Sequence, residues 1–143
     1  MIHLPPPELA KFVSVYVYKE LIQMKVKIDT KEKFHVFTPD VPFLSANMTE
    51  ELGEKLLPYI QTEIKNIILN LRLVNEIEAD VCKSILYLQE DFKNHKASFV
   101  ICEMQPGVEE IFEQQGLIDK LNVTPTESEA WDIVQMEEIE REF

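Results

Sequence analysis

The segment NIILNLRLV, residues 66–74, is an almost continuous apolar run with the length of a β-strand. A strand with one face in water alternates apolar and polar residues, whereas a strand covered on both faces reads as a continuous apolar run. Residues 97–104, ASFVICEM, have the same character. The two runs therefore predict buried strands in the interior of a sheet.

Amphipathic helical patterns lie between and after these runs. Apolar residues at spacings of four, three and four, with two more that widen the face, predict a helix after residue 80: Val81, Ile85, Leu88 and Phe92, then Cys82 and Leu86. An earlier apolar stripe from Leu52 to Ile64 predicts another helix, which Pro58 should kink or shorten. Asn47 precedes Glu50 by three residues, the spacing of a capping box at the start of that helix.

Two further helices are predicted toward the C-terminus. PGVEEIFEQQG, residues 106–116, has proline in its first turn and glycine past its end, as a short helix should. TESE, residues 126–129, is a capping box that opens a closing helix. NVTP, residues 122–125, predicts a short strand before that helix.

A hairpin is predicted ahead of all these elements. In MKVKID, apolar and polar residues alternate, which directs Met24, Val26 and Ile28 inward. FHVF repeats the alternation after the charged turn KEK. The full order is β-β-α-β-α-β-α-β-α, which predicts an α/β domain with a largely parallel sheet and right-handed crossovers. With 143 residues, the chain fits one domain of this kind.

Residues 1–23 precede this pattern and are read as an N-terminal extension. ELAKFVSVYVYKELIQ alternates valines with aromatics, as a strand does, but can also place one apolar face on a helix, which we favour. Its apolar residues must bury against something. We expect them to pack on the open face of the sheet or across a homodimer.

The charge of the chain restricts its partners. The 26 acidic residues against 14 Lys and Arg leave a net charge of −12. Binding to nucleic acid requires cations that neutralise phosphates, and anionic membranes attract basic segments, so neither partner is expected. Without a signal-peptide pattern or a membrane-spanning run, we expect a cytoplasmic protein.

Catalytic and cofactor motifs are not apparent in the sequence. His3, His35 and His95 have no nucleophile or carboxylate pattern around them, and no glycine array for phosphate follows a strand. Cys82 and Cys102 lack metal-ligand spacing and are read as buried free thiols in a reducing compartment. No enzyme activity, cofactor or metal is therefore predicted.

The junction at residues 78–81, Glu-Ala-Asp-Val, is the one candidate site. Acids in the first turn of a helix are stabilised by its dipole by about 0.3–1 kcal/mol, which explains Glu78 and Asp80 without any function. The same junction is also a favoured place for functional sites in α/β proteins. From the residues alone, both interpretations stay open.

The second half of the chain resembles the STAS domain family, the anti-anti-sigma factors, and especially its stand-alone bacterial members. The resemblance rests on IILNLRLVNEIEADVCKSIL and on SFVICEMQPGVEEIFEQQGLIDKLNVTPTESEA, and runs from Ile67 to about Glu142. A looser match extends back to Met24. The resemblance implies a STAS-like domain over residues 24–143, with a four- to five-stranded, mostly parallel mixed sheet and about four helices.

The resemblance also implies roles for the junction. In the family, the second serine of an Asp-Ser-Ser-Gly motif is phosphorylated by a partner kinase that is also an anti-sigma factor. In register, Glu78 takes the place of the aspartate, Ala79 of the first serine, Asp80 of the phospho-acceptor and Val81 of the glycine. These four residues are the expected partner-binding surface, with a carboxylate where the acceptor hydroxyl would be.

Two functions follow as hypotheses. The first is a non-catalytic regulatory module that binds a protein partner, with an anti-sigma factor serine kinase as the candidate, and that is not switched by phosphorylation at Asp80. The second is a structural or scaffolding subunit that takes no part in sigma-factor regulation.

Overall fold

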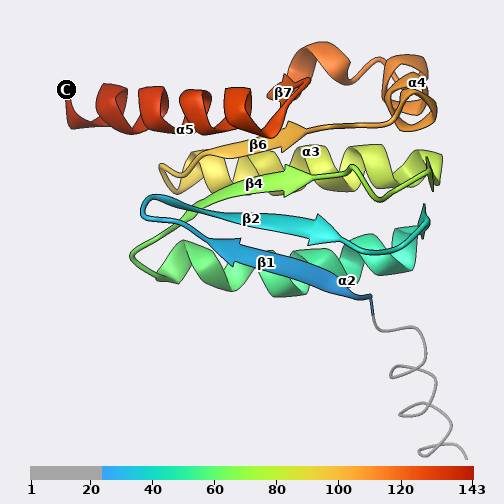
Figure 1. The fold of residues 1–143 in the computed structure, drawn as a ribbon, viewed down its shortest axis with the longest axis horizontal. Helices are drawn as coiled ribbons and strands as arrows, with labels where there is room; N and C mark the ends of the chain where they lie inside the picture. The colour runs from blue at the N-terminus through green and yellow to red at the C-terminus, as the bar shows by residue number, and fades with distance from the viewer. Residues whose placement is uncertain (1–23) are drawn as a thin grey trace, which may run out of the picture.

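The computed structural model describes residues 24–143, which form a mixed sheet packed between helices (Figure 1). The strands of the sheet, in the order β1-β2-β4-β6-β7, are β1 (Val26–Thr30), β2 (Phe34–Pro39), β4 (Asn66–Asn70), β6 (Phe99–Cys102) and β7 (Val123–Thr124). β1 is antiparallel to β2, and the other neighbours are parallel. The predicted four- to five-stranded, mostly parallel mixed sheet is confirmed, with five strands.

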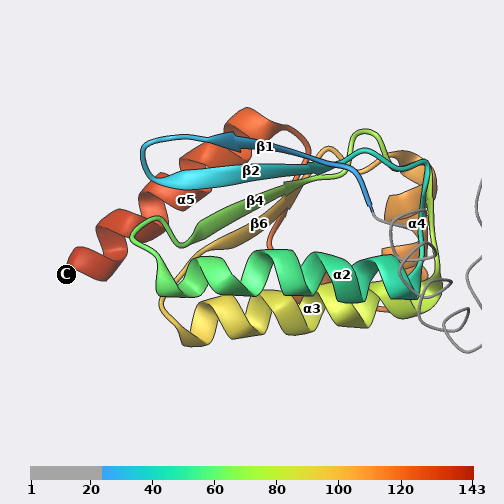
Figure 2. The same ribbon diagram turned by 90° about the horizontal axis from the view of Figure 1, so that it is seen from below.

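Helices cover both faces of the sheet. The described part of the chain holds α2 (Ala46–Leu56), α3 (Ala79–Asn94), α4 (Pro106–Gln114) and α5 (Glu127–Glu142), and two 3₁₀ turns, η1 (Leu57–Gln61) and η2 (Ile118–Lys120). Figure 2 shows α2 and α3 side by side below the sheet, α5 on its other face, and α4 beyond one end of the strands. The four predicted helices are therefore present in the predicted order.

Each face of the sheet has its own apolar core. The larger core lies under α2 and α3 and includes Phe37, Leu69 and Phe92. The smaller core lies under α5, where Ala130 and Val134 are buried against strand residues of the other face. β4 and β6 are buried at every position, because they lie between the two cores. This burial is the physical reason for the continuous apolar runs in the sequence.

Several local predictions are confirmed. α2 ends at Leu56 and continues as the 3₁₀ turn η1, with Pro58 in its first turn. Thr126 is the N-cap of α5, and its Oγ1 accepts a hydrogen bond from the backbone N–H of Glu129 at 3.2 Å. Gly116 follows α4 with a φ of +69°, the left-handed conformation that glycine adopts most easily.

The predicted capping box of α2 is wrong. The N-cap is Ser45 and not Asn47, because Ser45 has extended backbone and its Oγ accepts the N–H of Met48 at 3.2 Å. The helix therefore begins before Asn47. A serine two residues upstream gave the backbone an earlier cap of equal quality.

Ile28 is directed toward the α2 side of the sheet but is not buried there. Met24 is buried, but Ile28 is 51% exposed. Ile28 pairs with Phe37, so it lies on the α2 side of the sheet. β1 is the edge strand of the sheet, and the helices do not cover its middle.

Two expectations from the sequence concern residues 1–23. The helix or strand expected in residues 8–21, and the homodimer expected through residues 1–23, lie outside the described residues. Among residues 24–143, none of the helices combines the length and apolar character that crossing a membrane requires.

His35 is a buried titratable group of this fold. Its Nδ1 lies 2.8 Å from Oγ1 of Thr30, its Nε2 lies 3.1 Å from the carbonyl oxygen of Ile64, and its ring packs against Tyr59 at 4.4 Å between centroids. Burial of the ring lowers the pKa of His35 below its ordinary value, although the bond to Ile64 opposes this shift. The imidazole is therefore held in its neutral form.

We predict that His35 makes the protein less stable in mild acid. The unfolded chain takes up a proton near pH 6.5 and the folded chain resists it, so the free energy of unfolding should fall as the pH drops below 6.5. In His35→Gln this part of the fall should be absent in urea titrations at a series of pH values. His95→Gln, which changes an exposed histidine, is the matched control for the substitution itself. If the free energy of unfolding of His35→Gln fell with pH as steeply as that of the wild type, the loss of stability in acid would not come from His35.

Candidate functional site

The predicted site lies at the N-terminus of α3, where the chain returns from the carboxyl end of β4. Leu71, Val74 and Ile77 are buried and hold the connecting loop against the core. Glu78 is the N-cap residue with extended backbone, and its side chain makes no capping hydrogen bond. The apolar residues of the loop thus fix where the helix begins, while the side chain of Glu78 is not used to cap it.

A small second sheet frames this helix start. β3 (Phe43–Leu44) pairs in parallel with β5 (Glu76–Ile77), and the N–H of Glu78 donates to the carbonyl of Leu44 at 3.1 Å. This two-stranded sheet was not predicted. Its strands have two residues each, too few for an alternation pattern to show in the sequence.

The N-terminus of α4 supports the same loop from the other side. Nε2 of Gln105 donates to the carbonyl of Arg72 at 2.7 Å and to Oδ1 of Asn75 at 3.2 Å. A Cβ on Gly107 would lie 3.4 Å from the carbonyl oxygen of Asn75, which is a tight contact. The helix start is therefore held on both sides by neighbouring elements.

The four predicted site residues are not equivalent in the structure. Glu78, Ala79 and Asp80 are exposed at the surface, whereas Val81 is fully buried in the larger core. Asp80 lies in the first turn of α3, where the helix dipole favours its negative charge. Ser84, one turn further, donates from its Oγ to the carbonyl of Asp80 at 3.4 Å.

The cysteine thiols of the described residues are poor nucleophiles. Burial raises the pKa of Cys82 to about 11 and, together with Glu103 and Glu127, raises the pKa of Cys102 to about 12. Both thiols are protonated at neutral pH, and only the thiolate attacks or binds metal. Within residues 24–143, His, Cys, Asp and Glu form no group that could hold a metal ion.

A partly buried polar cluster lies near the predicted site, at the carboxyl ends of the parallel strands. Asn70, fully buried at the end of β4, donates from Nδ2 to Oε2 of Glu103 at 2.8 Å and to Oε1 of Glu127 at 3.0 Å. Its Oδ1 accepts the N–H of Arg72 at 3.0 Å. Glu127 also accepts the indole N–H of Trp131 at 3.2 Å. The sequence signal for this cluster was the polar residue inside the apolar run 66–74.

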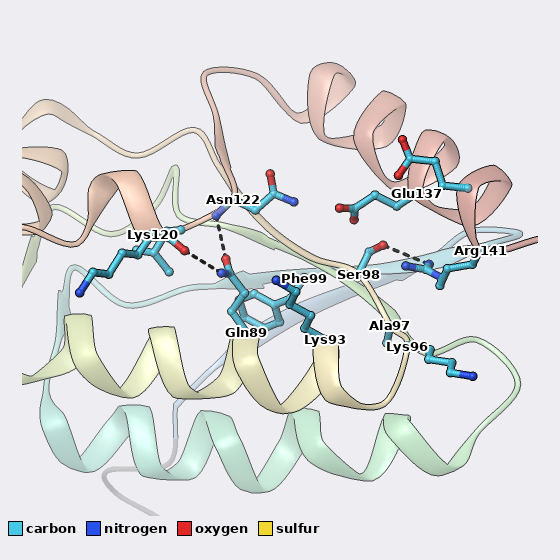
Figure 3. Close-up of a pocket in the computed structure, with 12 residues that line it drawn as sticks. Gln89, Lys93, Lys96, Ala97, Ser98, Phe99, Lys120, Asn122, Glu137 and Arg141 are labelled. Carbon is cyan, nitrogen blue, oxygen red and sulfur yellow. Dashed lines mark hydrogen bonds between the residues drawn. The ribbon is translucent and has the colours of Figure 1, made fainter. Parts of the chain in front are cut away.

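A groove of about 570 Å³ lies at the C-terminal end of α3, away from the predicted site (Figure 3). Gln89 and Lys93 of α3 form one wall, Glu137 and Arg141 of α5 form the other, and Phe99 of β6 lies between them. Sequence reasoning did not predict this groove. Its residues come from α3, β6, η2, α5 and the loops beside them, which no local sequence pattern connects.

Comparison with known proteins assigns the family. The sequence profile of the STAS domain matches residues 25–130. The chain belongs to the STAS domain family. The resemblance seen in the sequence is thus confirmed, and it extends through the first half of the domain.

Solved STAS structures share the fold at low sequence identity. A protein described as a putative anti-sigma factor antagonist from Thermotoga maritima has a TM-score of 0.67 at 16% identity, over 82% of this chain and 98% of its own. SpoIIAA of Bacillus in its unphosphorylated form has a TM-score of 0.64 at 18% identity, over 78% and 96%. RsbS of Moorella thermoacetica, in a serine-to-glutamate variant, has a TM-score of 0.63 at 14% identity, over 78% and 95%.

This STAS domain departs from the family pattern at the end of β4 as well. The family resemblance implies a strand that ends in Leu-Asp-Leu-Ser, and the corresponding residues of this chain are Leu69-Asn70-Leu71-Arg72. An amide at position 70 can donate to two carboxylates, whereas an aspartate there would place a third carboxylate beside Glu103 and Glu127. The local acids therefore explain why Asn stands at this position.

We predict that Asn70→Asp destabilises the domain by about 2–4 kcal/mol at pH 7, because it leaves a buried charge against two like charges. Urea denaturation measures the loss. The loss should shrink in acid, where the introduced carboxyl group is protonated and can donate, and in Asn70→Asp/Glu103→Gln, where the new amide can donate to the introduced carboxylate. An Asn70→Asp protein as stable as the wild type at pH 7 would show that the cluster does not restrain the fold.

Proposed function

We propose that this STAS-domain protein is a non-catalytic regulatory module that binds a protein partner at the N-terminus of α3. The observation that carries the proposal is the exposure of Glu78, Ala79 and Asp80 on a helix start held by β3 and by the N-terminus of α4. A rigid, exposed surface costs little conformational entropy on docking. The candidate partner is an anti-sigma factor serine kinase, as the resemblance to the family implies.

Asp80 gives this surface a permanent negative charge. Phosphoserine carries about −1.5 to −2 charges and three acceptor oxygens, whereas an aspartate carries at most one charge and two oxygens. Asp80 therefore imitates the sign of a phosphorylated serine at lower strength. We propose that the domain is no longer switched by phosphorylation at this position.

A scaffolding role is the second candidate. α5 exposes Met136 and Ile139, which are 53% and 56% exposed. Exposed apolar residues on one helix suit assembly with another subunit. The homodimer through residues 1–23 stays a prediction of the same kind.

We predict that a family-type anti-sigma serine kinase with ATP leaves residues 78–84 without stable phosphate. A carboxylate cannot form the stable phosphoester that a serine hydroxyl forms, and the Oγ of Ser84 is directed to the carbonyl of Asp80. Phosphopeptide mapping checks the result, and Asp80→Ser is the positive control that restores the hydroxyl. Phosphate on Ser84 in the wild type would show that the acceptor has moved by one helical turn.

We further predict how Asp80→Ser affects affinity. If Asp80 imitates phosphoserine, its removal should tighten binding of the kinase by about 1 kcal/mol or more, since a like charge at the docking surface is lost. If Asp80 only stabilises the helix start, Asp80→Ser should leave affinity unchanged and alter stability by less than about 1 kcal/mol. Titration calorimetry and thermal melts separate the two cases. Asp91→Ser, at the exposed far end of α3, is the control for a general loss of charge.

A further inference from the structure

The edge of β6 is only half paired. β7 pairs with Ile101 and Cys102 and does not reach Phe99. Backbone groups of successive strand residues point alternately to the two sides of a strand. The N–H of Ser98 donates toward β4, to Asn66, and the N–H of Ile101 donates toward β7, to Asn122. The N–H and C=O of Phe99 therefore point to the same side as β7, but no strand of the described chain lies opposite Phe99.

Gln89 is the residue that ends the ladder between β6 and β7. In a continued parallel ladder, the N–H of Asn122 would donate to the carbonyl of Phe99. It donates instead to Oε1 of Gln89 at 2.7 Å, and Nε2 of Gln89 donates to the carbonyl of Lys120 at 3.0 Å (Figure 3). The side chain of Gln89 thus holds the chain before β7, and Phe99, which is 2% exposed and lines the groove, has no strand paired with it on this side.

The two walls of the groove carry opposite charges. Lys93 of α3, Lys96 beyond it and Lys120 of η2 lie on one side, and none of these lysines forms an ion pair within residues 24–143. Glu137 and Glu140 of α5 lie on the other side. Arg141 is already engaged, since its Nη2 lies 3.1 Å from Glu138 and from Ser98. A ligand that is complementary to both walls must carry negative charge on the side that faces the lysines and positive charge on the side that faces the glutamates.

We propose that this groove binds an extended segment of a partner protein, which adds as a strand beside β6 at Phe99. Side chains of an added strand alternate between the two faces of the sheet. The acidic side chains of the segment face Lys93, Lys96 and Lys120, and its basic side chains face Glu137 and Glu140. The backbone groups of Phe99 supply the main-chain hydrogen bonds, and the charges of the walls select an alternating acidic and basic sequence.

The test uses the full chain and fluorescein-labelled hexapeptides, read by fluorescence anisotropy at low salt. A peptide of alternating Glu and Lys should bind at least about five-fold more tightly than a peptide of three Glu followed by three Lys, because only the first can satisfy both walls. Methylation of the backbone nitrogens of one set of alternate residues should lower the affinity of the alternating peptide by about ten-fold, because these N–H groups bond to β6. Methylation of the other set should leave the affinity unchanged. In ¹⁵N-labelled protein, the amide signal of Phe99 should shift on binding.

Charge reversal locates the contact. Lys93→Glu/Lys120→Glu should lower the affinity for the alternating peptide by about five-fold or more, as expected for the loss of exposed ion pairs. Lys27→Glu/Lys55→Glu, with the same change of charge on β1 and α2, is the matched control and should leave the affinity unchanged. Equal binding of both peptides, equal effects of the two methylated sets, or a larger effect of the control variant would overturn the proposal. A change in sedimentation of Lys93→Glu/Lys120→Glu without peptide would also overturn it, because the groove would then hold a second copy of the chain.

Discussion

Two buried asparagines at the ends of β4 hold the sheet and α5 together. Asn66 donates from Nδ2 to Oε1 of Glu138 at 2.6 Å, near the end of α5, and Asn70 donates to Glu127 at 3.0 Å, at its beginning. α5 buries only Ala130 and Val134 of its own residues. Trp131 and Ile133 add partly buried apolar contacts to the same core, and the polar bonds at both ends fix where this helix lies on the sheet. Both buried amides have hydrogen-bond partners, so these bonds stabilise the fold instead of leaving polar groups without partners.

The bond at the C-terminal end of α5 also perturbs a carboxylate. The bond from Asn66 lowers the pKa of Glu138, and Arg141 contributes in the same direction, although burial opposes it. Because the folded chain holds this group as a carboxylate more firmly than the unfolded chain, its contribution to stability is present above pH 4.5 and is lost as the pH falls through the lowered value. The attachment of α5 therefore keeps this contribution in full near neutral pH.

The sequence predicted a strand or helix correctly wherever its buried residues repeat along the chain at the spacing of that element. The runs 66–74 and 97–104 and the stripe of α3 specify strands and a helix because their apolar residues repeat along the chain. The position of Ser45 as the cap of α2, the exposure of Ile28 and the pairing of β3 with β5 depend on the folded surroundings, and the local patterns did not reveal them. The candidate site shows the same division. Glu78 and Asp80 could be placed at a helix start, and Val81 on the apolar face of that helix, but the support from Gln105 required the folded chain.

The two proposed binding surfaces lie on one helix and are electrostatically independent. Thirteen residues separate Asp80 from Lys93 on α3, a distance of about 20 Å along the helix axis at 1.5 Å per residue. Charges on the surface are screened over about 8 Å at physiological salt, so the charge of Asp80 does not reach the groove. Any coupling between the surfaces must therefore come from one partner that spans both, or from movement of α3 itself. Its face is buried at Val81, Ile85, Leu88 and Phe92 along its whole length, which opposes such movement, so the two surfaces can be occupied by separate partners without affecting each other.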